Sequence, residues 1–379
     1  MTSKLDTLCA YAKGKIAVED LNAQTYISTE NMTPNKGGIV DASSLPSVQY
    51  TQQYLKGDVL VSNIRPYFKK IWMAEYDGGC SNDVLVFRAK NGCDPTFLYY
   101  VLANDVFFDY ATATSKGTKM PRGDKTAIMQ YDVPDFELDT QLRIGKLLRS
   151  LDDRIATNKK INDNLYEMVN AYYTSLFKDV ECEMTTIGNY AERIYSGGTP
   201  TTSNATYWDG AFGWFSSGET RNRFVVSTEK TITQAGIDNS STKLAAKHDI
   251  VMASAGQGFT RGQTSMLLID TYVNQSVIVI HADKHALPYL FWNLANRYEE
   301  LRAISDSSSI RGSLTTKMIA AFEIPLANEE SLQAFADFSW SVIPQIENNL
   351  LENERLAALR DTLLPKLMSG EIDVSDIQL

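Results

Sequence analysis

Cysteine and histidine are scarce in this 379-residue chain, and long apolar runs are absent. The four cysteines, Cys9, Cys80, Cys93 and Cys182, show no paired spacing, which argues against a disulfide framework and favours a reducing compartment. The N-terminus lacks a basic-then-apolar signal pattern, and no run of about 18 apolar residues predicts a transmembrane helix. We therefore expect a cytoplasmic protein that is not inserted in a membrane.

The motifs of several enzyme classes are also missing. The sequence contains no P-loop for nucleotide phosphates, no G-x-S-x-G nucleophile turn, and no Asn/Asp-Pro-Pro-aromatic tetrapeptide of the kind that amino-methyltransferases use. His281 and His285 are four residues apart but have no third ligand nearby, so we expect no metal site. Together these absences favour a binding protein without catalytic residues and without a cofactor.

An internal repeat is the strongest feature that is present. KGDVL at 56–60 recurs as KHDIV at 247–251, and DVP at 132–134 recurs as EIP at 323–325, both 191 positions later. FLYY at 97–100 recurs as YLFW at 289–292, 192 positions later. Chance matches would not keep one offset over such different segments, so the chain is predicted to be a tandem duplication.

Each copy ends in a segment with apolar residues spaced alternately four and three apart, which is typical of a coiled-coil seam. Both seams place two asparagines near their middle, Asn158 with Asn162 and Asn349 with Asn353. Buried seam asparagines can fix the register of a helix pair, and antiparallel packing would bring these four together. Arg360 breaks the second seam, where neighbouring Leu359 is a candidate to take its place, and Pro344 is expected to kink that helix or mark its start.

The predicted fold class is α+β, with two similar mixed α/β domains separated by two long antiparallel coiled-coil helices and related by an internal pseudo-two-fold. The expected boundaries are 1–139 for the first domain, 140–180 for the first helix, 181–330 for the second domain, and 331–379 for the second helix and tail. At about 1.5 Å per residue, each helix of roughly 35 residues would be about 50 Å long.

Beyond the repeat, six further segments follow one another in a characteristic order: YSGGTP (195–200), YWDG (207–210), WFSSGE (214–219), VNQSV (273–277), SIRG (309–312) and LRDTLLPKLMSGEI (359–372). Through these segments, their order and the duplication, the whole chain resembles the specificity subunit of type I restriction–modification systems. The first copy departs from this pattern, because KGKIA (13–17) stands where the second has its SGGTP motif.

The resemblance implies two target-recognition domains, each of which reads one half of a bipartite double-stranded DNA site. It implies that the helices set the spacer and dock two methyltransferase subunits, and that motor-nuclease subunits join the restriction complex. It also implies that the specificity subunit has no catalytic residues of its own.

Candidate DNA-binding residues are side chains in the loops that can pair with bases or phosphates. In the first domain they are Asn63, Arg65, Tyr67, Lys69, Lys70, Lys116, Lys119 and Arg122. In the second domain they are Arg221, Asn222, Arg223, Gln257, Arg261, Arg311 and Lys317. The net charge of −10 offers few cations for phosphates, so we expect the isolated chain to bind DNA weakly.

Two other functions fit parts of the pattern. A two-lobed protein–protein adaptor on a coiled-coil stalk would show the same duplication without DNA specificity. A methyltransferase without familiar motifs would bind S-adenosylmethionine. Salt-dependent, sequence-selective DNA binding in the presence of a methyltransferase partner distinguishes DNA recognition from the adaptor. Stoichiometric binding of S-adenosylmethionine by the purified chain would favour the methyltransferase.

Overall fold

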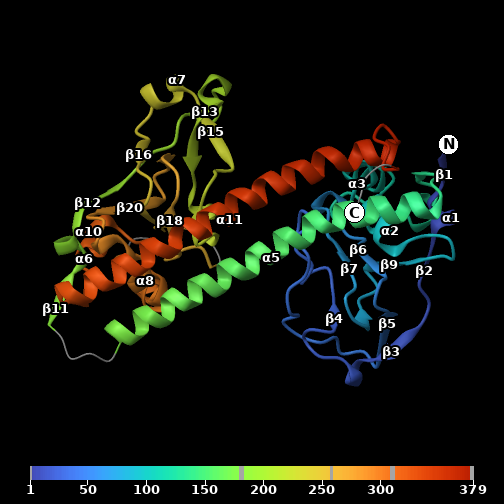
Figure 1. Ribbon diagram of the computed structural model, residues 1–379, viewed down its shortest axis with the longest axis horizontal. Coiled ribbons are helices and arrows are strands. Elements are labelled where there is room, and N and C mark those ends of the chain that lie inside the picture. The colour runs from blue at the N-terminus through green and yellow to red at the C-terminus, as the bar shows by residue number, and fades with distance from the viewer. Residues whose placement is uncertain (1, 179–182, 257–258, 308–311, 376–379) are drawn as a thin grey trace. The chain divides into compact units, whose positions relative to one another are not determined.

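The computed structural model describes residues 2–178, 183–256, 259–307 and 312–375, and the chain divides into two compact units. The first unit comprises Met1–Ile155 and Glu354–Leu379, and the second comprises Ala156–Asn353. Each unit contains a globular body and part of both long helices, α5 (Leu138–Phe177) and α11 (Glu329–Ser369) (Figure 1). The expected α+β class with two long helices is confirmed.

The body of the first unit contains two four-stranded sheets and a short strand pair. Its elements are β1 (Thr2–Lys4), α1 (Leu5–Leu8), β2 (Cys9–Tyr11), β3 (Lys15–Ala17), β4 (Tyr26–Ile27), β5 (Tyr50–Tyr54), β6 (Val59–Ser62), β7 (Ile71–Met73), β8 (Gly78–Cys80), β9 (Val84–Ala89), α2 (Pro95–Ala103), α3 (Asp105–Ala113), α4 (Lys125–Ile128) and β10 (Asp132–Pro134). One sheet has the order β2-β9-β6-β7 and the other β3-β5-β8-β4, while β1 pairs with β10.

The body of the second unit contains a five-stranded sheet, a four-stranded sheet and a short strand pair. Its elements are β11 (Met184–Thr186), α6 (Ile187–Tyr190), β12 (Ala191–Ser196), β13 (Trp208–Phe215), β14 (Phe224–Val225), β15 (Lys230–Ile232), α7 (Gln234–Asp238), β16 (Lys243–Ala245), β17 (Ile250–Ala253), β18 (Thr264–Leu267), β19 (Thr271–Val273), β20 (Val277–Ala282), α8 (Ala286–Asn296), α9 (Tyr298–Ser307), α10 (Thr316–Ala320) and β21 (Glu323–Pro325). The sheet orders are β12-β20-β17-β18-β14 and β15-β13-β19-β16, while β11 pairs with β21.

The two bodies share one topology, which confirms that their folds are similar. The order β2-β9-β6-β7 corresponds strand by strand to β12-β20-β17-β18, and β5-β8-β4 corresponds to β16-β19-β13. Even the direction of pairing is kept, since β4 is parallel to β8 and β13 is parallel to β19. The copies differ at the sheet edges. β14 is added only in the second unit, and the outer strands β3 and β15 lie at opposite edges, β3 beside β5 and β15 beside β13.

The repeated KGD/KHD sequence forms the turn that enters β6 and β17. Asp58 accepts a hydrogen bond from the backbone N–H of Leu55 at 2.8 Å, and Asp249 accepts the equivalent bond from Ala246 at 2.9 Å. The central residue is left-handed in both turns, with φ +90° at Gly57 and +78° at His248. The aspartate is therefore required by the turn itself, which explains why the pattern persists in both copies.

Both bodies pack in layers around two apolar clusters. In the first unit, Leu60, Trp72 and Val86 belong to the cluster shared with the second sheet, whereas Val61 and Phe87 belong to the cluster with α2 and α3. The same alternation separates Val251 from Ile250 in the second unit. Because successive strand residues point to opposite faces, each central strand is apolar throughout.

The long helices complete the core of each unit separately. In the first unit, Ile144 and Leu148 of α5 join Leu364 and Leu367 of α11 in the cluster that contains α2. In the second unit, Tyr173 and Phe177 of α5 pack on Phe335 of α11, with ring centroids 5.6 Å apart in both pairs. The helices are therefore part of both cores and are not a separate stalk.

The seam asparagines of α5 and α11 meet inside the second unit. The Asn158 amide donates to the side-chain oxygen of Asn353 at 3.0 Å, and the Asn349 amide donates to that of Asn162 at 2.8 Å. Residue numbers thus rise along one helix as they fall along the other, so the helices are antiparallel. Asn158 is fully buried.

The expectation for Leu359 and one of the two alternatives for Pro344 were wrong. Leu359 does not replace Arg360, because 47% of its surface is exposed, while Arg360 stays in the seam and pairs with Asp152 at 2.6 Å. Pro344 does not mark a helix start, since α11 begins at Glu329 and continues through it. The charge of Arg360 is tolerated because a carboxylate from the facing helix neutralises it.

Candidate nucleic-acid interface

Three loops converge at one end of the first sheet of the first unit. Residues 63–70 connect β6 to β7, and the backbone N–H of Arg65 donates to the carbonyl of Pro121 at 2.8 Å. Residues 29–36 join them through Asn35, whose N–H donates to the carbonyl of Phe68 at 2.8 Å. We call residues 29–36, 63–70 and 115–124 the first loop cluster. It brings together the eight candidates that the sequence indicates in this domain.

The backbone of the first loop cluster is unusual. Four residues that are not glycine have left-handed dihedrals there, with φ of 54° at Asn35, 60° at Lys36, 50° at Arg65 and 51° at Lys69. Such residues cost on the order of 1–3 kcal/mol each, and strained backbone is concentrated at functional sites. The loops are held in one conformation by the hydrogen bonds between them, so their side chains are presented in a fixed arrangement.

Most cations of the first loop cluster are paired with carboxylates or carbonyls. Lys36 and Lys69 both contact Asp105, at 2.8 and 3.1 Å, and Lys116 contacts Asp124 at 2.5 Å. Partial burial opposes ionisation of Asp105, but the hydrogen bonds from both lysines outweigh it and hold the pKa of this carboxyl below its usual value. These carboxylates offset part of the positive charge of the cluster, which limits its pull on phosphates.

The remaining cations of the first loop cluster are held in different ways. Lys70 donates to the carbonyl of Thr29 at 2.6 Å, and its partial burial lowers its pKa. Arg122 pairs with Asp83 at 3.2 Å, and Lys119 is exposed on the loop between Lys116 and Arg122. Of these three, Lys70 is half-buried, whereas Lys119 and Arg122, whose side chain is 55% exposed, are accessible to solvent.

Two buried polar atoms of the first loop cluster have no hydrogen-bond partner among the described residues. They are the side-chain oxygen of Asn63, which is 7% exposed, and Nε of Arg65. A buried polar group without a partner costs about 1–3 kcal/mol. Asparagine and arginine are also the side chains that pair most specifically with adenine and guanine.

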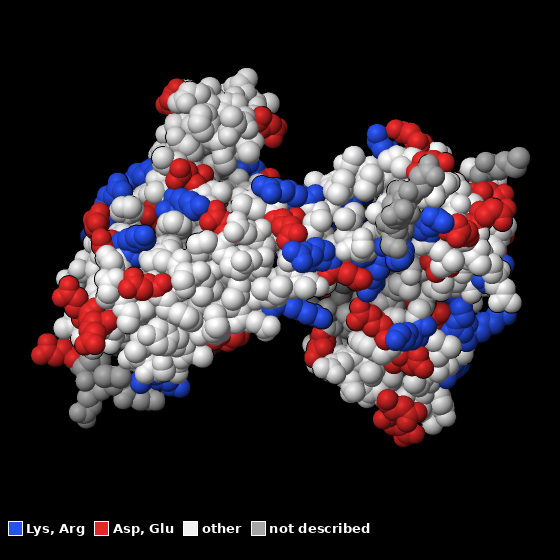
Figure 2. Space-filling model, viewed as in Figure 1, with Lys and Arg blue, Asp and Glu red and all other residues white. Residues whose placement is uncertain are grey.

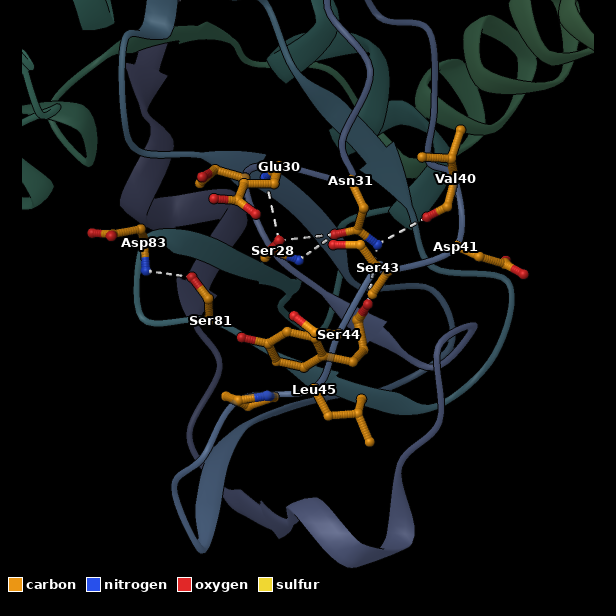
Figure 3. A pocket seen from close by; sticks show the side chains of 14 residues that line it. Ser28, Glu30, Asn31, Val40, Asp41, Ser43, Ser44, Leu45, Ser81 and Asp83 are labelled. Atoms are coloured by element: carbon orange, nitrogen blue, oxygen red, sulfur yellow. Dashed lines mark hydrogen bonds between the residues drawn. The ribbon is translucent and has the colours of Figure 1, made fainter. Parts of the chain in front are cut away.

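A polar hollow that the sequence did not indicate borders this cluster (Figure 3). It has a volume of about 420 Å³, and its lining includes Ser28, Glu30, Asn31, Asp41 and Asp83. Asn31 holds its wall together, since its amide donates to the carbonyl of Val40 at 2.9 Å and its oxygen accepts the N–H of Ser28 at 2.6 Å. Carboxylates there could accept a hydrogen bond from the amino group of cytosine or adenine, but they repel phosphates.

Of the described candidates in the second unit, three directly precede β14, Arg261 precedes β18, and Lys317 lies in α10. Arg221 donates to the carbonyl of Gly218 at 2.7 Å and also pairs with Glu229. Arg223 lies 4.2 Å from the ring centroid of Tyr166, a residue of α5. Asn222 is exposed, and so is Lys317 at the start of α10. Gln257 and Arg311 lie outside the described residues.

Arg261 is engaged inside the second unit. Its guanidinium contacts the hydroxyl of Ser305 at 3.0 Å, Asp306 at 2.6 Å and the carbonyl of Gly312. Only 16% of its side chain is exposed. This arginine ties its own loop to α9, so base contact by Arg261 remains a prediction that requires these bonds to break.

Two properties of the described residues concern metal binding and thiol reactivity. These residues contain no group of three His, Cys, Asp or Glu side chains that could hold a metal ion. Burial raises the pKa of the Cys9, Cys80 and Cys93 thiols to about 12, so these cysteines are not thiolates at neutral pH. None of the described helices combines the length and the hydropathy that a membrane span requires.

The fold and the loops together define a class: a duplicated α+β protein with a candidate polyanion-binding surface in its loops. Residues 1–167 and 180–354 match the family described as type I restriction modification DNA specificity domain. The chain belongs to this family of specificity subunits.

Individual relatives agree with this assignment. The HindI specificity subunit of Haemophilus influenzae is 22% identical, over 93% of this chain and 96% of its own. The EcoR124I/EcoR124II specificity subunit of Escherichia coli is 26% identical over 54% of this chain and 52% of its own. A crystal structure of the type I system S subunit from M. genitalium has a TM-score of 0.59 at 16% identity and covers 97% of this chain and 96% of that one, which shows a shared fold.

Proposed function

We propose that this chain is the DNA sequence-recognition subunit of a type I restriction–modification complex, and that each body reads one half of a bipartite site. The observation that carries the proposal is one strand framework with two different sets of loops. The β6–β7 connection holds Arg65 and Lys69, whereas the equivalent β17–β18 connection ties its Arg261 inward. A shared scaffold with divergent loops suits two half-sites of different sequence.

The charge distribution supports a reader that needs partners. On the face shown in Figure 2, lysine and arginine side chains are interspersed with aspartate and glutamate over both units. Affinity for DNA depends on the number of phosphates that cations neutralise, so this chain alone should bind weakly and lose its affinity steeply with salt. Partner methyltransferase subunits would supply much of the remaining contact.

The two long helices are proposed to set the spacer and to dock two methyltransferase subunits, with motor-nuclease subunits joining for restriction. The contacts between Asn158 and Asn353 and between Asn162 and Asn349 support a role in register, because slipping either helix would leave these polar groups unpaired. The chain itself would be non-catalytic and act on DNA in the cytoplasm, without a cofactor.

The proposal is tested in cells that carry the complete system. Methylation-sensitive sequencing should find modification at one split sequence with a spacer of fixed length. Modification without any common split sequence would refute the proposal. Binding of S-adenosylmethionine by the purified chain at one molecule per chain would instead favour an enzyme, and assembly without DNA selectivity would favour an adaptor.

Individual contacts are tested by paired arginine substitutions. Arg65→Ala with Arg122→Ala should relax selectivity at one position of one half-site, by about 1–3 kcal/mol for each lost base contact. A matched control removes two cations elsewhere in the unit, Lys4→Ala with Lys90→Ala. Equal modification of every substituted target by the arginine variant and the control would contradict the assignment.

A further inference from the structure

Both bodies expose a phenylalanine at the same place in their framework. Phe68 lies in the β6–β7 connection and Phe259 in the β17–β18 connection, 191 positions later, which is the offset of the repeat. The exposed fractions of these residues are 37% and 82%. A single exposed apolar side chain is common on protein surfaces, but here the duplication places one at the same position in both copies.

Hydrogen bonds from elsewhere in each body hold the main chain of both phenylalanines. Phe68 ends the short 3-10 helix η2 (Pro66–Phe68), which lies between the left-handed residues Arg65 and Lys69. Its carbonyl accepts a hydrogen bond from the N–H of Asn35 at 2.8 Å, while the carbonyl of Phe259 accepts one from the hydroxyl of Tyr298 at 2.7 Å. In both copies the body therefore anchors the main chain of the phenylalanine and leaves its ring accessible.

The surroundings of Phe68 match nucleic acid. The ring of Tyr67 lies against it with centroids 4.8 Å apart, and the charged groups of Arg65 and Lys70 each lie 6.0 Å from its centroid. An apolar ring flanked by cations complements a base step, which has a stacked interior and a phosphate on each side. A wholly apolar protein partner would not require these cations.

We propose that Phe68, backed by Tyr67, and Phe259 are wedges that enter the base stack of duplex DNA, one in each half-site. The proposal rests on the DNA-reading function above and adds a mechanism to it. The backbone strain at Arg65 and Lys69 fixes the wedge before binding, so little ordering remains to be done on contact. Unstacking costs less at flexible pyrimidine–purine steps, so the wedges would add selectivity for such steps.

The test uses the complete complex with its methyltransferase subunits. The DNA is a duplex that contains the split sequence at which the complex methylates. The probe is 2-aminopurine, which replaces adenine, placed in turn at each adenine of both half-sites except a base that is methylated, because methyltransferases flip their target base out of the helix. The wild-type complex should raise the fluorescence at one step in each half-site.

Phe68→Ala should abolish the rise in one half-site and Phe259→Ala in the other, and each should weaken binding about 5- to 150-fold. Tyr50→Ala and Phe212→Ala are matched controls, since both remove rings that are exposed elsewhere in the same units. These controls should keep both signals.

Three other outcomes would overturn the proposal. If the wild-type complex binds DNA selectively but 2-aminopurine fluorescence rises at no step, the two rings do not enter the base stack, while the proposed DNA-reading function stands. If the alanine variants fail to assemble with the methyltransferase, the rings serve a protein contact. If the wild-type complex shows no selectivity, the reading function itself fails.

Discussion

Asp152 of α5 is the centre of a polar node whose loss should destabilise the first unit. Its carboxylate accepts a hydrogen bond from the hydroxyl of Tyr100 at 2.6 Å and forms an ion pair with Arg360 at 2.6 Å. Asp152 therefore links α2, α5 and α11. Tyr100 is 1% exposed, and burial followed by the nearby Asp152 raises its pKa, so its hydroxyl remains a donor. Asp152→Ala removes the acceptor of Tyr100 and one of the two carboxylates beside Arg360.

The expected cost follows from the burial of each partner. A buried hydroxyl left without a partner costs about 1–3 kcal/mol. Arg360, whose side chain is 22% exposed, keeps Asp361 at 2.9 Å, so losing its second partner should cost about 1 kcal/mol, below the range for fully buried pairs. The sum is about 2–4 kcal/mol.

The neighbouring residue supplies the control. Asp153 pairs with Arg149 at 2.8 Å, but its side chain is 59% exposed, so Asp153→Ala should cost at most about 1 kcal/mol. Both substitutions replace aspartate by alanine in the same helix, so changes in helix propensity cancel.

Hydrogen exchange followed by mass spectrometry measures the effect within the first unit. Exchange in α2 and in the parts of α5 and α11 that belong to this unit should be about 30- to 1,000-fold faster for Asp152→Ala than for the wild type. Combining Tyr100→Phe, Asp152→Leu and Arg360→Leu should restore most of the protection, because apolar residues can replace a buried ionic node. Equal exchange in the Asp152→Ala and Asp153→Ala variants would refute the reasoning.

Three further predictions concern the helices and the second unit. Asn158→Leu with Asn353→Leu should stabilise the helix pair by about 1–3 kcal/mol in thermal unfolding while broadening the spacer preference; unchanged selectivity would argue against a register role. One helical turn inserted within residues 156–162 should change the spacer that the complex modifies, as read by sequencing, and an unchanged spacer would exclude the helices as its determinant. Burial and nearby Lys247 lower the pKa of His248 in the folded chain, so protonation of this residue opposes folding, and the second unit should lose stability as the pH falls below about 6.5. Asparagine tolerates the left-handed backbone at this position, so His248→Asn should reduce the dependence of the melting temperature on pH.

The parts of the fold that the sequence could predict are those set by local rules. The four–three spacing of apolar residues identified both long helices, because packing along a helix repeats with that period. The repeated aspartates Asp58 and Asp249 marked equivalent turns, since the turn needs a side-chain acceptor at that position.

The parts that could not be predicted depend on contacts between distant segments. No local pattern places Asn35 and Lys36 against the β6–β7 loop, because their hydrogen bonds to Phe68 and Lys69 span more than thirty residues. The same holds for Arg360, which looked out of place in an apolar seam. Its partner Asp152 lies on the other helix, and only the antiparallel pairing brings the two together.

The loops could diverge while the framework stayed constant because each hairpin is fixed at its other end. The buried turn aspartate needs a positively charged or hydrogen-bonding partner, and the copies meet this need differently: Arg88 binds Asp58 at 2.6 Å, whereas the Nδ1 of His281 lies 2.5 Å from Asp249. Both partners come from the strand next to β6 or β17, so the turn at the entry of each hairpin is fixed from within the sheet. Because the other end of the hairpin is not needed for this, its loop is free to change, and recognition can change with it at little cost to folding.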